Sequence, residues 1–214
     1  AMASLRISVK SKDPDLVGRM FTAKMVELAL ANYPGLYMGG AVRSGGPVLV
    51  YWPALIDSKH IKETVHIDGK EIDVMPTNQL NLEETYYQKQ PVEMPPPPSG
   101  ETLNKPLGEL FGARSGDKGG CANIGVWAKN QNAFSFLNNY LTIEKIKELM
   151  PDISEFKIDR YELPNILSLN FYIHDILEDG VSSNTRKDGQ AKSLGEYLRA
   201  KYADIPKSLL EENI

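Results

Sequence analysis

The densest group of side chains that could do chemistry lies between residues 112 and 123, in the run GARSGDKGGCAN. Its glycines allow tight turns that aim backbone N–H groups at an anion. Arg114 and Lys118 supply positive charge for a carboxylate or a phosphate. Ser115 and Asp117 add a hydroxyl group and a carboxylate that can act as a base. We therefore predict an anion-binding loop with Ser115 and Asp117 as catalytic residues. Its ligand-binding residues are expected to be Arg114, Gly116, Lys118, Gly119, Gly120 and Asn123.

A purely structural interpretation of the same run is equally open. The glycines could form a tight turn between two strands, with Asp117 paired to Arg114 or Lys118. A nucleotide-binding P-loop is excluded, because the run lacks Gly-Lys-Ser/Thr and no helix start follows it.

Other candidate residues carry weaker signals. Arg43 lies in a second glycine-rich loop, residues 37–47, and repeats the anion-binding chemistry, although a flexible connection is the favoured interpretation. Cys121 has no histidine close in sequence, so an inert thiol is favoured over a nucleophile. His174 is expected in a helix with its hydrogen bonds satisfied, and Trp127 is expected in the core.

Composition excludes several classes of function. The chain has 214 residues, with 24 basic and 28 acidic side chains and a net charge of −4, which argues against nucleic-acid binding. One cysteine and three histidines argue against a disulfide framework or a zinc cluster. We therefore predict no metal and no cofactor. No membrane-spanning run and no signal-peptide pattern are found, so a cytoplasmic location is expected.

The pattern of elements predicts an α+β fold made of two small α/β sandwich units joined by a proline-rich linker. In the first unit we expect a helix from about 14 to 31 and strands at 5–9, 48–52, 64–67 and 70–74, the last two joined by an Asp-Gly turn. Residues 77–104, with four consecutive prolines at 95–98, are the predicted linker.

The second unit has the size of a ferredoxin-like domain. Strands are expected at 107–113 and 123–128 on either side of the glycine-rich loop, and at 156–161. Helices are expected at 132–149 and 189–202. The apolar run at 166–178 is ambiguous, and its three-to-four spacing favours a helix.

Several of these motifs resemble the AtuA family of acyclic terpene utilisation. Residues 107–109, 112–120 and 122–128 are similar to the family's C-terminal ferredoxin-like domain, as are residues 160–165, 169–171, 180–182 and 190–196. Upstream, the motifs at 17–19, 27–31, 33–35 and 51–55 resemble the end of the family's main domain. Cys121 departs from the pattern, because a polar residue is expected at its position.

The resemblance implies three regions. Residues 4–76 would be the C-terminal part of the main domain, 77–104 the linker and 105–214 the ferredoxin-fold domain. Because family members are usually longer, we expect the chain to be a C-terminal portion of such a protein. The family is linked to catabolism of citronellol- and geraniol-type terpenes, in which acids are handled as coenzyme A thioesters.

Two functions follow as alternatives. The chain could bind or act on an organic acid or an acyl-CoA through the Arg/Asp/Lys loop, and whether it is an enzyme stays open. Alternatively, it could be a non-catalytic assembly domain whose glycine-rich loop is structural. A homo-oligomer is expected in either case, with no nucleic-acid or membrane partner.

Overall fold

The computed structural model describes residues 3–29, 31, 33–40, 43–74 and 92–211. It divides into two compact units. One unit comprises residues 1–51 and 94–214, and the other comprises residues 52–93. Each is described by itself.

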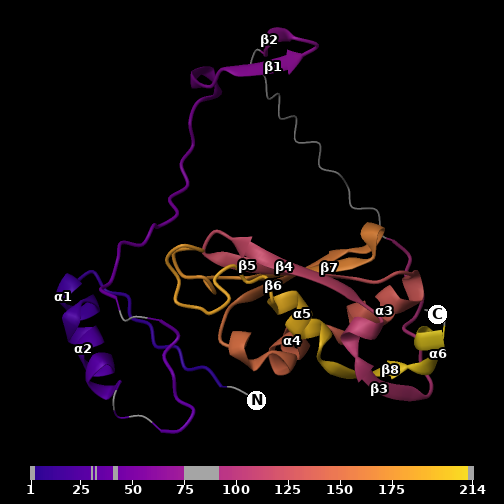
Figure 1. Ribbon diagram of the computed structural model, residues 1–214. Coiled ribbons are helices and arrows are strands. Elements are labelled where there is room, and N and C mark those ends of the chain that lie inside the picture. Colours follow the sequence, from indigo (N-terminus) through magenta and orange to yellow (C-terminus); the bar gives the residue numbers. More distant parts are fainter. Residues whose placement is uncertain (1–2, 30, 32, 41–42, 75–91, 212–214) are drawn as a thin grey trace. The chain divides into compact units, whose positions relative to one another are not determined.

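The larger unit is built on an antiparallel sheet of four strands in the order β4-β5-β7-β6 (Figure 1). The bounds are Gly112–Lys118 for β4, Cys121–Trp127 for β5, Ile158–Leu163 for β6 and Ser168–Ile173 for β7. Helices α3, α4 and α5 lie against one face of this sheet (Figure 1). They span Gln131–Tyr140, Ile143–Leu149 and Leu194–Arg199.

The two central strands show why the sheet has one buried face. Buried and half-buried residues alternate along β5 and β7, as expected for a sheet covered on one side only. Apolar side chains point toward the helices, and Ile124, Leu169 and Phe171 are completely buried. They pack in one cluster with Phe134 and Leu137 of α3. Burial of this apolar surface is the main stabilising contribution in the unit.

Smaller elements complete the larger unit. Strands β3 (Thr102–Pro106) and β8 (Tyr202–Pro206) form a separate antiparallel pair, and α6 spans Lys207–Glu211. Near the N-terminus, α1 (Pro14–Val17) and α2 (Arg19–Leu28) contain no buried residue. Single 3-10 turns span Leu107–Glu109, Pro151–Ile153 and Pro164–Ile166.

The smaller unit contains one β-hairpin, β1 (Glu63–Ile67) and β2 (Lys70–Val74), preceded by a 3-10 turn at Ser58–His60. Asp68 and Gly69 both have positive φ, +49° and +73°, as the tight turn between twisted strands requires. The predicted hairpin with its Asp-Gly turn is therefore confirmed.

The α+β fold class is confirmed as well, but several predicted elements are wrong. Residues 168–173 form strand β7 instead of a helix, because Leu169, Phe171 and Ile173 alternate with polar residues and all three pack inward. The expected helix at 132–149 is two helices, because Thr142 accepts a hydrogen bond from Lys145 N and starts α4 anew. The expected helix at 189–202 is only the short α5.

Other differences concern strands. Residues 5–9 and 48–52 form no strand, and the side chains of Leu5, Ile7 and Leu49 are exposed. The glycine-rich loop is two strands and a turn, and β3 and β8 were not predicted. Most of the predicted linker, residues 77–91, lies outside the described residues, and its last residues, 102–104, belong to β3.

Candidate functional site: the open face of the sheet

The predicted anion-binding loop is a β-hairpin. Strands β4 and β5 pair from Gly112 opposite Trp127 to Lys118 opposite Cys121, and only Gly119 and Gly120 remain for the turn. Gly119 has a φ of +66°, which favours glycine. A Cβ atom on Gly120 would overlap the carbonyl oxygen of Glu178. These glycines therefore allow the turn and its close packing.

Because alternate residues of a strand point to opposite faces, β4 separates the predicted site residues. Ser115 and Asp117 lie opposite the fully buried Ile124 and Ala122, on the face covered by α5. Arg114, Gly116 and Lys118 point to the other face. Arg114 is consequently separated from Ser115 and Asp117 by the sheet itself.

The two predicted catalytic residues have partners near the start of α5. The Ser115 hydroxyl donates to the carbonyl of Lys192 at 3.0 Å and accepts from the N–H of Gly195 at 2.9 Å. Asp117 Oδ1 lies 3.9 Å from Lys192 Nζ. A Cβ on Gly195 would lie only 3.2 Å from the backbone of Arg114, so α5 packs tightly on β4. Ser115 thus joins β4 to α5, and its catalytic role stays a prediction.

The opposite face of the sheet gathers side chains from all four strands. The strand registers place Arg114, Gly125, Asn170 and Tyr161 in one row across it. The adjacent row consists of Gly116, Asn123, Tyr172 and Asp159. The amide of Asn123 donates to Asn170 Oδ1 at 2.8 Å, and this bond fixes both side chains. The predicted residue Asn123 therefore lies on the same face as Arg114.

One end of this open face contains an apolar cavity of about 520 Å³. Its side-chain lining includes Trp127, Tyr161, Leu163, Ile166 and Asn170. The four apolar members are between 40% and 65% exposed. The prediction that Trp127 lies in the core is wrong, because Trp127 is on the strand face opposite the helices.

The cation nearest to this cavity in the sheet is Arg114, which is exposed and lies opposite the cavity residue Gly125. Within the described ranges, its guanidinium has no hydrogen-bond or ion-pair partner. Lys118 instead donates to the carbonyl of Asp117 at 2.9 Å. Arg114 is therefore the member of the predicted set that remains available to an anion.

The other end of the open face is polar. His174 Nε2 lies 2.7 Å from Asp159 Oδ2, and hydrogen bonding to His174 lowers the pKa of Asp159. A hydrogen bond with Cys121 and burial raise the pKa of Tyr172, whose ring meets the His174 ring edge-on at 4.9 Å. His174 has a partner, as expected, but it follows a strand instead of lying in a helix.

This second set of residues, and the cavity residues Tyr161 and Ile166, could not be predicted from the sequence, because they come from different strands and turns. The alternation of residues 168–173 was the one available signal. Across the described part of the chain, no group of three or more His, Cys, Asp or Glu residues could hold a metal ion. No described helix is both long and apolar enough to cross a membrane.

The fold and this face define an α+β protein with an open sheet that offers an apolar cavity beside an exposed arginine. Two family models match the chain. The AtuA ferredoxin-like domain matches residues 105–203, and the acyclic terpene utilisation family protein AtuA matches residues 1–67. The chain therefore belongs to the AtuA family of acyclic terpene utilisation. No curated protein and no solved structure was found to match it. The predicted domain boundaries stay predictions.

Proposed function

We propose that the open face of the sheet binds a branched organic acid of acyclic terpene catabolism. The observation that carries this proposal is the apolar cavity at the end of a sheet face that also bears Arg114, which has no partner among the described residues. The hydrocarbon chain of the acid would occupy the cavity, and its carboxylate would accept two parallel hydrogen bonds from Arg114. The cavity volume of about 520 Å³ falls within the range of small-molecule sites.

The lining of the cavity supports an acid with a largely apolar body. Trp127, Tyr161, Leu163 and Ile166 offer exposed apolar surface that a hydrocarbon chain would remove from water. Asn170 supplies a polar group beside them, and its oxygen is already held by Asn123. A ligand with a polar head and a branched apolar tail satisfies both kinds of neighbour.

An acyl-CoA remains the alternative form of the ligand. A thioester carbonyl is uncharged, so it gains less from Arg114 than a carboxylate does. We therefore propose the free acid as the preferred ligand at this face. Ser115 and Asp117 point away from the face, which favours binding over catalysis by these two residues.

Calorimetric titration with geranic acid, geraniol and geranoyl-CoA tests the proposal. We expect the acid to bind most tightly, and Arg114→Ala to weaken it about 10- to 100-fold, since a charge-assisted hydrogen bond contributes about 1.5–3 kcal/mol. Arg19→Ala is the matched control, because Arg19 is exposed on α2 and does not line the cavity. Equal affinity of the Arg114 and Arg19 variants for the acid would refute the role of Arg114.

The same exposed apolar side chains support the second candidate function, an assembly surface. A partner subunit lying on Trp127, Tyr161, Leu163 and Ile166 would bury the surface that we assign to the ligand. Light scattering of the wild type and of Tyr161→Lys distinguishes the two. A dimer that Tyr161→Lys dissociates favours assembly, whereas a monomer in both proteins favours the ligand site.

A further inference from the structure

A second cavity, of about 420 Å³, lies in the larger unit, and its described lining includes no residue of the four-stranded sheet. Its lining comes from the N-terminal segment 6–11, helices α1 and α2, the loop 43–48 and the residues 183–185. The predicted anion-binding residue Arg43 belongs to this cavity and is therefore not part of the open face.

The charged residues of the cavity lining are cations. Arg6, Lys10 and Arg43 line it, and none of the described lining residues is an aspartate or a glutamate. The Nε atom of Arg6 donates to Ser8 Oγ at 3.1 Å, which holds the side chain and leaves its terminal nitrogens unbonded in the described structure. The Arg43 guanidinium has no hydrogen-bond or ion-pair partner within the described segments. Two guanidinium groups are thus available to a ligand.

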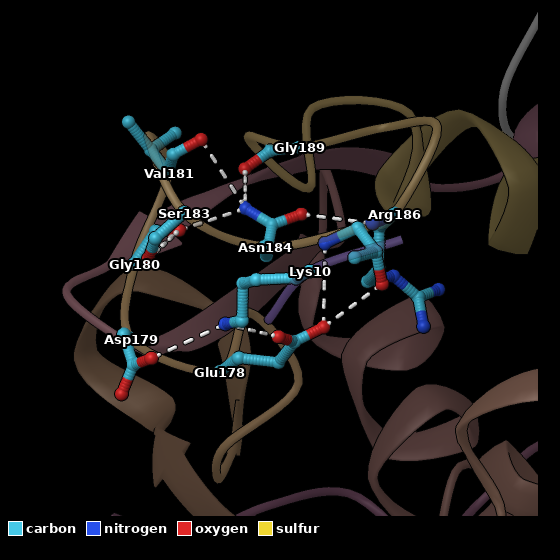
Figure 2. Close-up of polar contacts among 10 residues, drawn as sticks. Lys10, Glu178, Asp179, Gly180, Val181, Ser183, Asn184, Arg186 and Gly189 are labelled. Carbon is cyan, nitrogen blue, oxygen red and sulfur yellow. Dashed lines mark hydrogen bonds and ion pairs between the residues drawn. The ribbon is translucent and has the colours of Figure 1, made fainter. Parts of the chain in front are cut away.

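Lys10 of the cavity lining forms ion pairs with two carboxylates (Figure 2). Lys10 Nζ donates to Glu178 at 2.7 Å and to Asp179 at 3.2 Å. The Thr185 N–H and hydroxyl both donate to the other oxygen of Glu178. The hydrogen bond from Lys10 lowers the pKa of Glu178, so that this carboxylate keeps its charge below the usual glutamate range. Lys10 therefore offsets one of these two negative charges, and with Arg6 and Arg43 the five groups carry a net charge of +1.

The wall formed by residues 183–185 is held in place by one side chain. The Asn184 amide donates to the carbonyls of Gly180 and Gly189 at 2.9 and 3.0 Å, and its oxygen accepts from the N–H of Arg186 at 3.1 Å (Figure 2). These bonds connect Gly180 and Gly189, at the two ends of the turn, to Asn184 at its centre. The cavity wall is thereby shaped before a ligand arrives, which reduces the entropic cost of binding.

The lining also has an apolar part, which includes an aromatic ring. Val9, Val17, Phe21 and Val48 line the cavity beside the cations. A small inorganic anion would leave this surface in contact with water. A ligand that carries phosphate groups next to a flat apolar portion would use both parts of the lining.

We propose that this second cavity binds a phosphorylated small molecule of the nucleotide type, with its phosphates between Arg6 and Arg43 and its base against Phe21. The shared chemistry is a diphosphate attached to an aromatic base. A free nucleotide and the nucleotide end of coenzyme A both present it. The inference is independent of the organic-acid site, because the two cavities share no lining residue.

Calorimetric titration of the whole chain with ADP, inorganic pyrophosphate, adenosine and coenzyme A tests it. ADP is expected to bind more tightly than pyrophosphate, and adenosine to bind at least tenfold more weakly than ADP. Arg43→Ala and Arg6→Ala should each weaken ADP and pyrophosphate about tenfold, and Phe21→Ala should weaken ADP alone. Raising the salt concentration should lower the affinity for both anions.

Two controls keep the result interpretable. Arg19→Ala removes an exposed arginine outside the cavity and should bind ADP as the wild type does. Arg114→Ala should also leave ADP binding unchanged, which separates this site from the organic-acid site. Circular dichroism spectra and melting temperatures report whether each variant is folded.

The titration with coenzyme A distinguishes the two natural ligands that could supply the diphosphate, a free nucleotide and the coenzyme. Coenzyme A binding at least as tightly as ADP assigns the site to the coenzyme, whereas ADP binding without coenzyme A assigns it to a free nucleotide. Both results support the proposal. Absence of ADP and pyrophosphate binding, or equal affinities in folded Arg43→Ala and Arg19→Ala, would overturn it.

Discussion

The indole ring of Trp127 lies directly over Gly112 on the neighbouring strand. The two residues are register partners, and most register partners in a sheet both carry side chains. Here a Cβ atom at position 112 would overlap the indole ring. Gly112 therefore leaves the space in which Trp127 lies flat, and Trp127 in that position forms one wall of the apolar cavity.

Gly112→Ala should displace the indole and narrow or distort the cavity. We expect a loss of about 1–3 kcal/mol in the free energy of unfolding, as for other overpacked sites, and weaker binding of the organic acid. Tryptophan fluorescence in a Trp52→Phe background reports the displacement of Trp127 alone. For the fluorescence and stability measurements Gly125→Ala is the matched control, because its Cβ would meet only the Arg114 carbonyl oxygen, at an ordinary 3.9 Å. Unchanged Trp127 fluorescence in Gly112→Ala would contradict this account.

Ser115→Ala should destabilise the fold without changing ligand affinity. The hydroxyl joins β4 to α5 through one donated and one accepted hydrogen bond, so its loss should cost about 1–2 kcal/mol. Urea unfolding measures this cost, and Ser182→Ala, at an exposed site, should cost little. If Ser115→Ala is as stable as the wild type but loses turnover in a longer AtuA protein, the catalytic interpretation is correct instead.

The elements that could be predicted from the sequence are those whose signal lies within a few neighbouring residues. The Asp68-Gly69 turn could be predicted because the two residues themselves require the unusual backbone conformation. The hairpin at 112–127 could not, because its glycines are typical of loops and weaken a strand pattern. Once β4 is known to be a strand, the separation of Arg114 from Ser115 follows from alternation alone.

The open face posed a different difficulty, because it depends on strand order. Trp127, Tyr161 and Asn170 are far apart in sequence and meet only since β7 lies between β5 and β6. The apolar residues at 166–178 also fit a helical spacing, and nothing local decides between the two periods. Packing against α3 decides it, because all three inward residues of β7 are completely buried.

Arg160→Ala should strongly destabilise the larger unit. Arg160 is on β6, its side chain is only 16% exposed, and it donates to the carbonyls of Asn138 and Leu141 at 2.7 and 3.1 Å. These bonds join the end of α3 to the sheet, and their loss should cost about 2–3 kcal/mol in urea unfolding. Arg160→Lys should recover less than half of it, because lysine lacks the planar fork. A cost below about 0.5 kcal/mol for Arg160→Ala would show that the contacts contribute little.

Asp188 should give α5 a pH-dependent stability. Burial acts to raise the pKa of Asp188, but hydrogen bonds from Ser193 and Lys192 outweigh it and hold the pKa below the usual value of 3.8. Its carboxylate accepts from the N–H groups of Lys192 and Ser193 at 3.0 and 2.8 Å and from the Ser193 hydroxyl at 2.6 Å. Since the folded-state pKa is lowered, this stabilisation is fully present above the usual pKa and is lost as pH falls through the lowered one.

Asp188→Asn keeps the shape of the side chain and removes its charge, so it isolates this contribution. The wild type should be more stable than Asp188→Asn by about 1–2 kcal/mol at neutral pH, because hydrogen bonds to a carboxylate are stronger than those to an amide. Urea unfolding from about pH 7 down to about pH 2 should show that difference shrinking only below the usual aspartate pKa. A difference that stays constant down to the lowest pH would mean that the charge of Asp188 does not stabilise the start of α5.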